Sequence, residues 1–183
     1  MAAILGLDDD TVKAVCEQAS DAGIVEAVNF NSPGQVVIAG SKSAVDKAVM
    51  MASEKGAKRA LLLPVSVPSH CALMRPAAEK LSAELESVSI QTPNIPVIHN
   101  TSVTSTSDPD QIRQLLAQQL YNPVRWVETV EWFAAQGVEI LVECGPGKVL
   151  AGLTKRIDKS LQALPVFDSA TLQKTQEVLG EPS

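Results

Sequence analysis

Residues 24–40 read Ile24-Val-Glu-Ala-Val-Asn-Phe-Asn-Ser-Pro-Gly-Gln-Val-Val-Ile-Ala-Gly40, and this stretch decides the fold of the first third of the chain. Two short runs within it, residues 24–30 and 35–39, are rich in apolar side chains, and each predicts a β-strand. Between them, Asn31-Ser-Pro-Gly34 carries Pro and Gly at positions that favour a chain reversal. The stretch therefore predicts a hairpin.

The predicted hairpin is flanked on each side by one strand and one helix. Residues 2–7 are apolar and predict a strand, and Asp8–Asp10 then favours a helix start, because carboxylates suit the free N–H groups there. A second helix follows Ser41, and residues 58–65 predict a fourth strand. The apolar stripes of the two helices are Val12, Val15, Cys16, Ala19 and Val45, Ala48, Val49, Ala52. This order is that of a ferredoxin-like unit over residues 1–66, a fold that alone says nothing about function.

The remaining residues, 67–183, predict a helix-rich α/β unit. The expected helices follow Cys71 and Lys148 and cover about 109–120, 124–136 and 171–179, and the expected strands are Pro96–His99, Val138–Cys144 and Pro165–Phe167. Strands separated by helices are typical of a parallel sheet covered on both faces. Three short strands are few for so many helices, so we expect further strands on another segment or another chain.

Composition excludes several classes of function. The chain has 183 residues, a net charge of −6 and 3% aromatic residues, so it lacks the basic surface that phosphates need and is not expected to bind nucleic acid. No apolar run reaches the ~20 residues of a membrane span, and the start lacks the basic region of a signal peptide. We therefore expect a cytoplasmic protein with no membrane partner. The distant cysteines Cys16, Cys71 and Cys144 favour reduced thiols over a metal site, with Cys16 and Cys144 buried.

His70 is the best candidate for chemistry. It lies in the link between a predicted strand and a predicted helix, where catalytic groups are often presented, and imidazole is the usual base near neutral pH. A base needs a nucleophile, but the sequence contains no Gly-x-Ser-x-Gly, and the neighbours Ser69 and Cys71 project in other directions. His99 ends a short predicted strand, and we expect a surface imidazole or a hydrogen-bonded core imidazole there.

Three further features have a structural and a functional interpretation. Gly145–Lys148 joins a strand to a helix, where anions bind, but it departs from the phosphate-loop pattern and is interpreted as a tight turn. Gln119 falls on an apolar helix stripe, and a buried amide must find partners. Lys55, Lys58 and Arg59 form a basic cluster that is either a solvated helix end or a docking patch for an acidic partner.

Five ordered blocks within residues 29–150 carry a family resemblance. They are Asn29-Phe-Asn-Ser-Pro-Gly-Gln-Val-Val-Ile-Ala-Gly40, Lys58-Arg59, Leu63-Pro-Val-Ser-Val-Pro-Ser-His-Cys71, Gln119-Leu-Tyr-Asn-Pro-Val-Arg-Trp126 and Glu143-Cys-Gly-Pro-Gly-Lys-Val-Leu150. They resemble the malonyl-CoA:acyl carrier protein transacylases of bacterial fatty acid synthesis. The resemblance implies a ferredoxin-like small subdomain, residues 1–66, and the C-terminal part of an α/β-hydrolase-like large subdomain, residues 67–183.

The resemblance also implies a two-step transfer of malonyl from CoA to a serine and then to the phosphopantetheine thiol of acyl carrier protein. His70 matches the family's catalytic histidine, and the Gln119 carbonyl matches the group that orients its imidazole. Asn31 matches a residue that lines the acyl and pantetheine site. Lys58 and Arg59 match basic positions near the CoA phosphates and the carrier-protein docking face. No cofactor is implied, because malonyl-CoA is a substrate and the partner carries the phosphopantetheine.

One departure from the family decides what the chain is expected to do alone. Family members carry roughly 125 further N-terminal residues, by comparison with a two-subdomain enzyme, and these hold a Gly-His-Ser-Leu-Gly nucleophile elbow, an oxyanion-hole Gln and an Arg for the malonyl carboxylate. None of these matches this sequence, so we expect a C-terminal part that is inactive alone and needs the missing segment as a partner. The alternative is a catalytically silent fragment that only binds acyl carrier protein or CoA.

Overall fold

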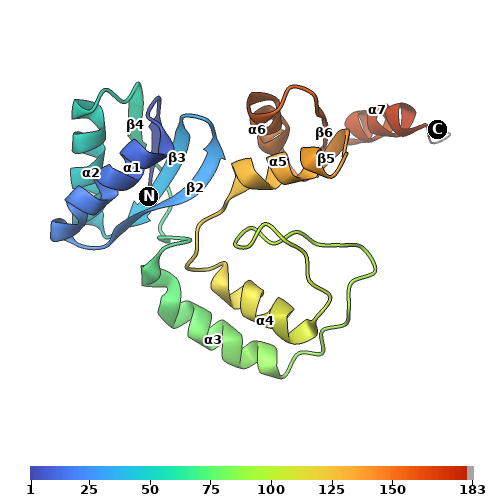
Figure 1. The fold of residues 1–183 in the computed structure, drawn as a ribbon, viewed down its shortest axis with the longest axis horizontal. Coiled ribbons are helices and arrows are strands. Elements are labelled where there is room, and N and C mark those ends of the chain that lie inside the picture. The colour runs from blue at the N-terminus through green and yellow to red at the C-terminus, as the bar shows by residue number, and fades with distance from the viewer. Residues whose placement is uncertain (181–183) are drawn as a thin grey trace. The chain divides into compact units, whose positions relative to one another are not determined.

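The computed structural model describes residues 1–180 of the chain, which is drawn in Figure 1. It divides into two compact units, Met1–Trp126 and Val127–Ser183. The family resemblance predicts a subdomain boundary between residues 66 and 67, and that boundary stays a prediction.

The first unit begins with a four-stranded antiparallel sheet in the order β2-β3-β1-β4. Its strands are β1 (Ala2–Leu5), β2 (Val25–Ser32), β3 (Gln35–Gly40) and β4 (Arg59–Leu62), and its helices are α1 (Asp9–Ala19), the short η1 (Ser20–Ala22) and α2 (Lys42–Glu54). Figure 1 shows α1 and α2 together on one face of the sheet. The predicted order of strands and helices is confirmed.

Local chemistry explains where these elements begin and turn. The Asp8 side chain accepts a hydrogen bond from the Thr11 N–H at 2.8 Å and so caps α1. Pro33 and Gly34 join β2 to β3, and Gly34 has φ +71°, a conformation that glycine adopts without a steric penalty. The two predicted helix stripes lie in the core with Ile4 and Ile38 of the sheet. Cys16 is buried as predicted, and burial raises the pKa of its thiol to about 12.

The outer edge of β2 also pairs with a distant segment. Asn29 and Val124 form an isolated parallel bridge, in which the Phe30 N–H binds the Val124 carbonyl at 3.0 Å and the Val124 N–H binds the Val28 carbonyl at 2.8 Å. The sheet is thereby tied to the chain that follows α4 (Pro109–Gln118).

Two helices complete the first unit. The short η2 (Ala72–Met74) leads into α3 (Arg75–Glu86), which packs against α4. Pro76 lies in the first turn of α3, where its missing N–H has no helical partner to lose. Ala78 is the buried residue of α3, whereas the neighbouring Ala77 is exposed.

The prediction of a strand over Pro96–His99 is wrong. Within the described residues, only an antiparallel bridge between Ile98 and Ser105 forms there. An extended segment becomes a strand only where a neighbour pairs along it, and a single bridging residue does not provide that pairing.

The second unit contains a two-stranded parallel sheet, as the alternation of strands and helices predicts. Its elements are α5 (Trp126–Ala135, which begins at the last residue of the first unit), β5 (Ile140–Cys144), α6 (Val149–Ile157), β6 (Gln162–Val166) and α7 (Ser169–Leu179). The expectation that Cys144 is buried is wrong, because its thiol is exposed, and Val142 on the same strand is 38% exposed. Within the described residues, the faces of this narrow sheet are only partly covered.

Candidate functional site

His70 is held in a left-handed backbone conformation. Its φ is +67°, which is uncommon for a residue with a side chain, although histidine tolerates it better than bulky or β-branched residues do. The His70 N–H donates to the Leu120 carbonyl at 2.9 Å. The chain after α4 therefore fixes the backbone from which the imidazole projects.

The imidazole of His70 binds the carbonyl oxygen of Gln119, with 2.7 Å between Nδ1 and that oxygen. A carbonyl oxygen only accepts hydrogen bonds, so Nδ1 carries the proton of the neutral ring. The lone pair is then on Nε2, which is the nitrogen able to take a proton from another group.

The C-terminal end of α4 provides both carbonyls that His70 uses. Gln119 is the residue that caps α4, and Leu120 follows it. The last carbonyls of a helix have no partner within the helix, so they are free to bind groups from elsewhere in the chain. The sequence drew attention to Gln119 through its side-chain amide, whereas the observed contact uses its backbone.

Cys71 does not form a dyad with His70. Its Sγ donates to the Pro68 carbonyl at 3.2 Å, and burial raises the pKa of the thiol, which keeps it neutral. The next residue, Ala72, donates its N–H to Glu26 Oε2 at 3.0 Å. Sequence reasoning did not find Glu26, because a single carboxylate on a predicted strand carries no pattern.

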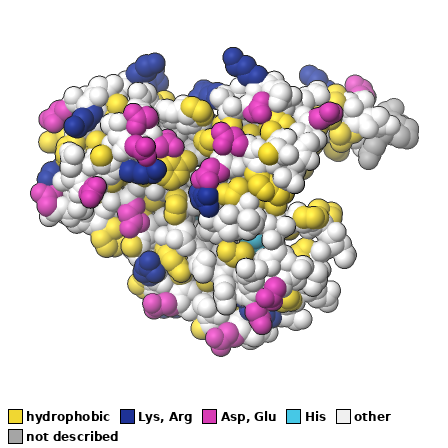
Figure 2. All heavy atoms as spheres, in the orientation of Figure 1, with side chains coloured by type: hydrophobic (Ala, Val, Ile, Leu, Met, Phe, Trp, Pro, Cys, Tyr) yellow, Lys and Arg dark blue, Asp and Glu magenta, His cyan; other side chains and the backbone are white. Residues whose placement is uncertain are grey.

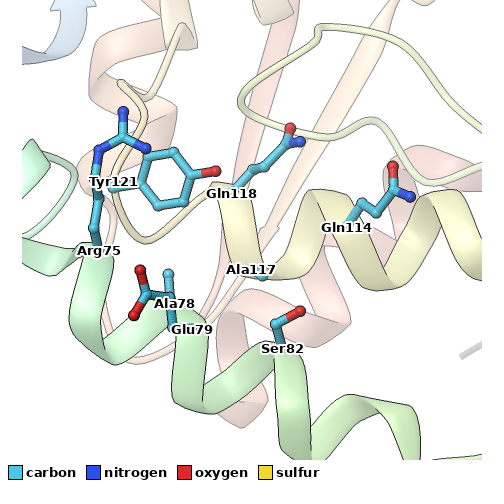
Figure 3. Close-up of a pocket in the computed structure, with 8 residues that line it drawn as sticks. All are labelled: Arg75, Ala78, Glu79, Ser82, Gln114, Ala117, Gln118 and Tyr121. Carbon is cyan, nitrogen blue, oxygen red and sulfur yellow. The ribbon is translucent and has the colours of Figure 1, made fainter.

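A pocket of about 280 Å³ lies between α3 and α4. Its lining includes Arg75, five residues after His70, and Gln118, the residue before Gln119. Figure 3 shows the Arg75 guanidinium beside the Tyr121 ring, and its carbon lies 4.4 Å from the ring centroid, a cation–π contact. Polar side chains of both helices line the rest of the pocket: Glu79, Ser82, Gln114 and Gln118. No sequence pattern indicates Arg75, because its partner lies 46 residues away.

The second histidine, His99, is half-buried, which matches neither the surface imidazole nor the hydrogen-bonded core imidazole expected for it. Its Nε2 is buried without a partner, as are Thr101 Oγ1 and Trp126 Nε1, within the described part of the chain. Burial lowers the pKa of His99, because a buried imidazole is more easily kept neutral. Arg125 binds the residues that follow His99: its N–H donates to the Asn100 carbonyl and its guanidinium to the Thr101 carbonyl.

The other predicted site residues do not join the His70 contacts. Asn31 is half-buried near the end of β2, while Lys58 and Arg59 are exposed at the start of β4. No hydrogen bond in the described structure links any of the three side chains to His70. Figure 2 shows Lys and Arg side chains on the visible face in small separate groups among acidic ones. The predicted roles of these residues stay predictions.

The Gly145–Lys148 segment is a tight connection between β5 and α6. The Glu143 carboxylate accepts the N–H groups of Leu150 and Ala151, at 3.0 and 2.8 Å. The chain's own carboxylate thus occupies the helix N-terminus where an external anion would bind, which agrees with the interpretation as a turn.

Neither a metal centre nor a membrane span is found in the part of the chain that the structure describes. Among residues 1–180, no three His, Cys, Asp or Glu side chains gather closely enough to hold a metal ion. In the same residues, no helix combines the length and the apolar character needed to cross a bilayer.

The chain is similar to known proteins over almost its whole length. It is 55% identical over 179 residues to the malonyl CoA-acyl carrier protein transacylase of Haemophilus influenzae, covering 98% of this chain, and 53% identical to that of Escherichia coli. It also matches the crystal structure of an acyl-carrier-protein S-malonyltransferase from Burkholderia pseudomallei, with 56% identity, a TM-score of 0.94 and 96% of this chain covered. A malonyl-transacylase solved in complex with a type II PKS acyl-carrier protein matches with 51% identity, a TM-score of 0.95 and 97% of this chain covered.

The match covers only part of each relative. The chain spans 57% of the Haemophilus protein, 58% of the Escherichia protein and 57% of each of the two solved chains. The α/β fold with two sheets is therefore shared with part of the acyltransferase structures. The family model described as "Acyl transferase domain" matches residues 2–180, and the chain accordingly belongs to the acyl transferase domain family.

Proposed function

We propose that this chain is the histidine-bearing part of an enzyme that transfers malonyl from CoA to the phosphopantetheine thiol of acyl carrier protein. The observation that carries the proposal is the 2.7 Å contact between His70 Nδ1 and the Gln119 carbonyl. It leaves Nε2 as the basic atom of an imidazole whose orientation is fixed, and that is what a general base needs. The relatives named malonyl CoA-acyl carrier protein transacylase supply the reaction class.

In the proposed reaction His70 moves one proton in each half. Nε2 takes the proton of a serine hydroxyl outside this chain while the serine oxygen attacks the malonyl thioester carbonyl. The carbon–sulfur bond then breaks, and the departing CoA sulfur takes that proton from the imidazole. In the second half, Nε2 takes the proton of the carrier thiol while the thiol sulfur attacks the carbonyl of the malonyl–serine ester. The ester carbon–oxygen bond then breaks, and the serine oxygen takes the proton from the imidazole.

The remaining site residues are assigned by family match. Asn31 lines the acyl and pantetheine site, and Lys58 with Arg59 lies near the CoA phosphates and the docking face for acyl carrier protein. The exposure of both basic side chains supports a docking role, because steering of an acidic partner needs accessible charge. A cytoplasmic location and the lack of a cofactor stay predictions.

We also propose the finer architecture that the resemblance implies. Residues 1–66 form a ferredoxin-like subdomain, which the β2-β3-β1-β4 strand order supports. Residues 67–183 belong to an α/β-hydrolase-like subdomain, which the parallel pairing of β5 with β6 supports.

The test is a hybrid enzyme in which the unmatched remainder of the Haemophilus relative is joined to this chain. We expect the hybrid to transfer radiolabelled malonyl from CoA to holo acyl carrier protein, and this chain alone to transfer none. A folded hybrid that transfers nothing, although the intact relative is active in the same assay, would contradict the proposal.

Binding measurements separate the transferase from the silent fragment. If the hybrid is inactive but this chain binds acyl carrier protein, and the double change Lys58→Ala with Arg59→Ala weakens that binding, the silent binding fragment is favoured. Lys13→Ala with Lys42→Ala is the matched control, since both lysines are exposed and lie on α1 and α2.

A further inference from the structure

Glu26 on β2 connects the four-stranded sheet to the segment that carries His70. Its Oε2 accepts the N–H of Ala72 at 3.0 Å, two residues after His70. Ala72 is the first residue of η2, and the first N–H groups of a helix have no partner within it. Glu26 supplies that partner from 46 residues away in the sequence.

The backbone that Glu26 holds is strained at His70. A left-handed conformation in a residue with a side chain persists where the surroundings over-determine it. Here the His70 N–H is bound to Leu120, Cys71 is buried with its thiol on Pro68, and the Ala72 N–H is bound to Glu26. Contacts of His70 itself and of the two residues that follow it thus restrain the strained conformation.

The same strand also anchors the partner of the imidazole. Val124, five residues after Gln119, is hydrogen-bonded to the backbone of Val28 and Phe30 on β2. The backbone of β2 binds the chain that follows Gln119, and the Glu26 side chain of β2 binds the chain that follows His70. Both atoms of the Nδ1–carbonyl contact are therefore tied to one strand.

We propose that Glu26 is a positioning residue for the His70 imidazole. Its carboxylate fixes the Ala72 N–H, and with it the backbone of residues 70–72, so that Nδ1 stays on the Gln119 carbonyl. The effect on transfer rests on the proposed function, because orientation matters for the reaction only if His70 is the base. Glu26 acts through Ala72 and is not a catalytic residue.

A purely structural role is the competing explanation. Besides burial, the Glu26 charge raises the pKa of the Cys16 and Cys71 thiols, so the carboxylate lies close to two buried side chains of the unit. A change at Glu26 could therefore lower stability without moving the imidazole. The test needs a readout of the His70 ring itself.

The kinetic test uses the hybrid enzyme with Glu26→Ala, Glu26→Gln and the control Glu17→Ala, an exposed carboxylate on α1. We expect Glu26→Ala to lower kcat about 10- to 100-fold with KM nearly unchanged, because small misplacements of catalytic groups cost rates of this order. Glu26→Gln keeps an accepting oxygen and should restore kcat to within about 3-fold. Glu17→Ala should match the unchanged enzyme. An unchanged kcat in folded Glu26→Ala overturns the proposal.

The spectroscopic test uses this chain alone and does not depend on transfer. In a His99→Gln background, the ring ¹⁵N signals of His70 report which nitrogen carries the proton. We expect Glu26→Ala to convert one Nδ1–H form into a mixture and to speed exchange of the Ala72 amide, and Glu26→Gln to do neither. Unchanged ring signals overturn the proposal. If Glu26→Ala does not fold, Glu26→Met, of similar length but without an accepting oxygen, takes its place.

The two tests distinguish the failure of this proposal from that of the proposed function. If the hybrid with the unchanged chain is inactive while the ring signals respond to Glu26, the positioning by Glu26 holds and the transferase assignment falls. If the hybrid is active and neither kcat nor the ring responds, the positioning role falls and the transferase assignment stands.

Discussion

The two histidines of the chain lie in the same unit but in opposite kinds of surroundings. The ring of His70 has a fixed acceptor 2.7 Å from Nδ1, and its strained backbone is hydrogen-bonded. The ring of His99 has Nε2 buried without a partner within the described residues. The comparison teaches that burial alone does not make a site. A helix end that orients an imidazole prepares it for chemistry, whereas burial without a partner only costs stability.

The largest expected difference between the two histidines is in catalysis. In the hybrid enzyme, His70→Ala should lower malonyl transfer about 10²- to 10⁴-fold, which is the usual contribution of a positioned general base. His99→Gln should lower it less than about 3-fold. Initial rates at saturating malonyl-CoA measure both. Equal losses in the two variants would contradict the separation of roles.

A second prediction concerns Arg113, which joins α3 and α4, the two helices next to His70 and Gln119 in the sequence. Arg113 on α4 donates to the carbonyls of Leu85 and Val88 at the end of α3, at 3.0 and 2.9 Å, and to Asp110 at 2.6 Å. Arg113→Ala should lower the free energy of unfolding by about 1.5–3 kcal/mol, because these bonds involve a charged group. Urea denaturation measures this loss.

Arg113→Lys is the matched control, since it keeps the charge but cannot bind all three groups. It should recover less than half of the lost stability. Full recovery would mean that the charge, and not the planar arrangement of donors, joins the two helices.

A third prediction concerns the response of folding stability to acid, which should depend on His99. Burial lowers the pKa of His99, so below its unfolded value near 6.5 the unfolded chain binds more protons than the folded one. The free energy of unfolding is therefore highest above that value. It falls as the pH is lowered through the folded pKa of His99, with a slope of at most about 1.4 kcal/mol per pH unit.

Unfolding midpoints between pH 7.5 and pH 5 measure this slope. His99→Gln removes the titrating group and should flatten the curve, whereas His70→Gln provides the matched comparison at the other histidine. A curve of the same steepness in His99→Gln would show that another group causes the acid sensitivity.

The smallest expected effect is at Gln119. Its backbone carbonyl binds His70, and its φ and ψ of −61° and −19° suit alanine well. Gln119→Ala should therefore change transfer by the hybrid less than about 3-fold. A loss comparable to that of His70→Ala would assign the orienting role to the side-chain amide.

Sequence patterns predicted best the elements whose partners lie nearby in the chain. The hairpin of residues 24–40 and the stripes of α1 and α2 were predictable because each packs against its sequence neighbours. The environments of Cys144 and of Pro96–His99 were not, since burial and pairing there depend on what lies beside them in space.

In the candidate site, too, features set by neighbouring residues were predictable, and contacts between distant residues were not. His70 was predictable from its place between a strand and a helix, and the Gln119 carbonyl only from the family resemblance. Glu26, Arg75 and the buried surroundings of His99 were not predictable, because their contacts join residues 20–50 positions apart or depend on packing. A hydrogen bond from a lone side chain to a distant backbone group leaves no periodic signal in the sequence.

The most direct test of the account is the protonation of the two imidazoles in this chain, measured by long-range ¹H–¹⁵N correlation at pH 8. The chain has only two histidines, so His99→Gln assigns both sets of signals. We expect His70 to be a single neutral form with the proton on Nδ1, as the 2.7 Å contact with the Gln119 carbonyl requires. A proton on Nε2 of His70, or an even mixture of the two forms, would show that the end of α4 does not orient this imidazole as a base.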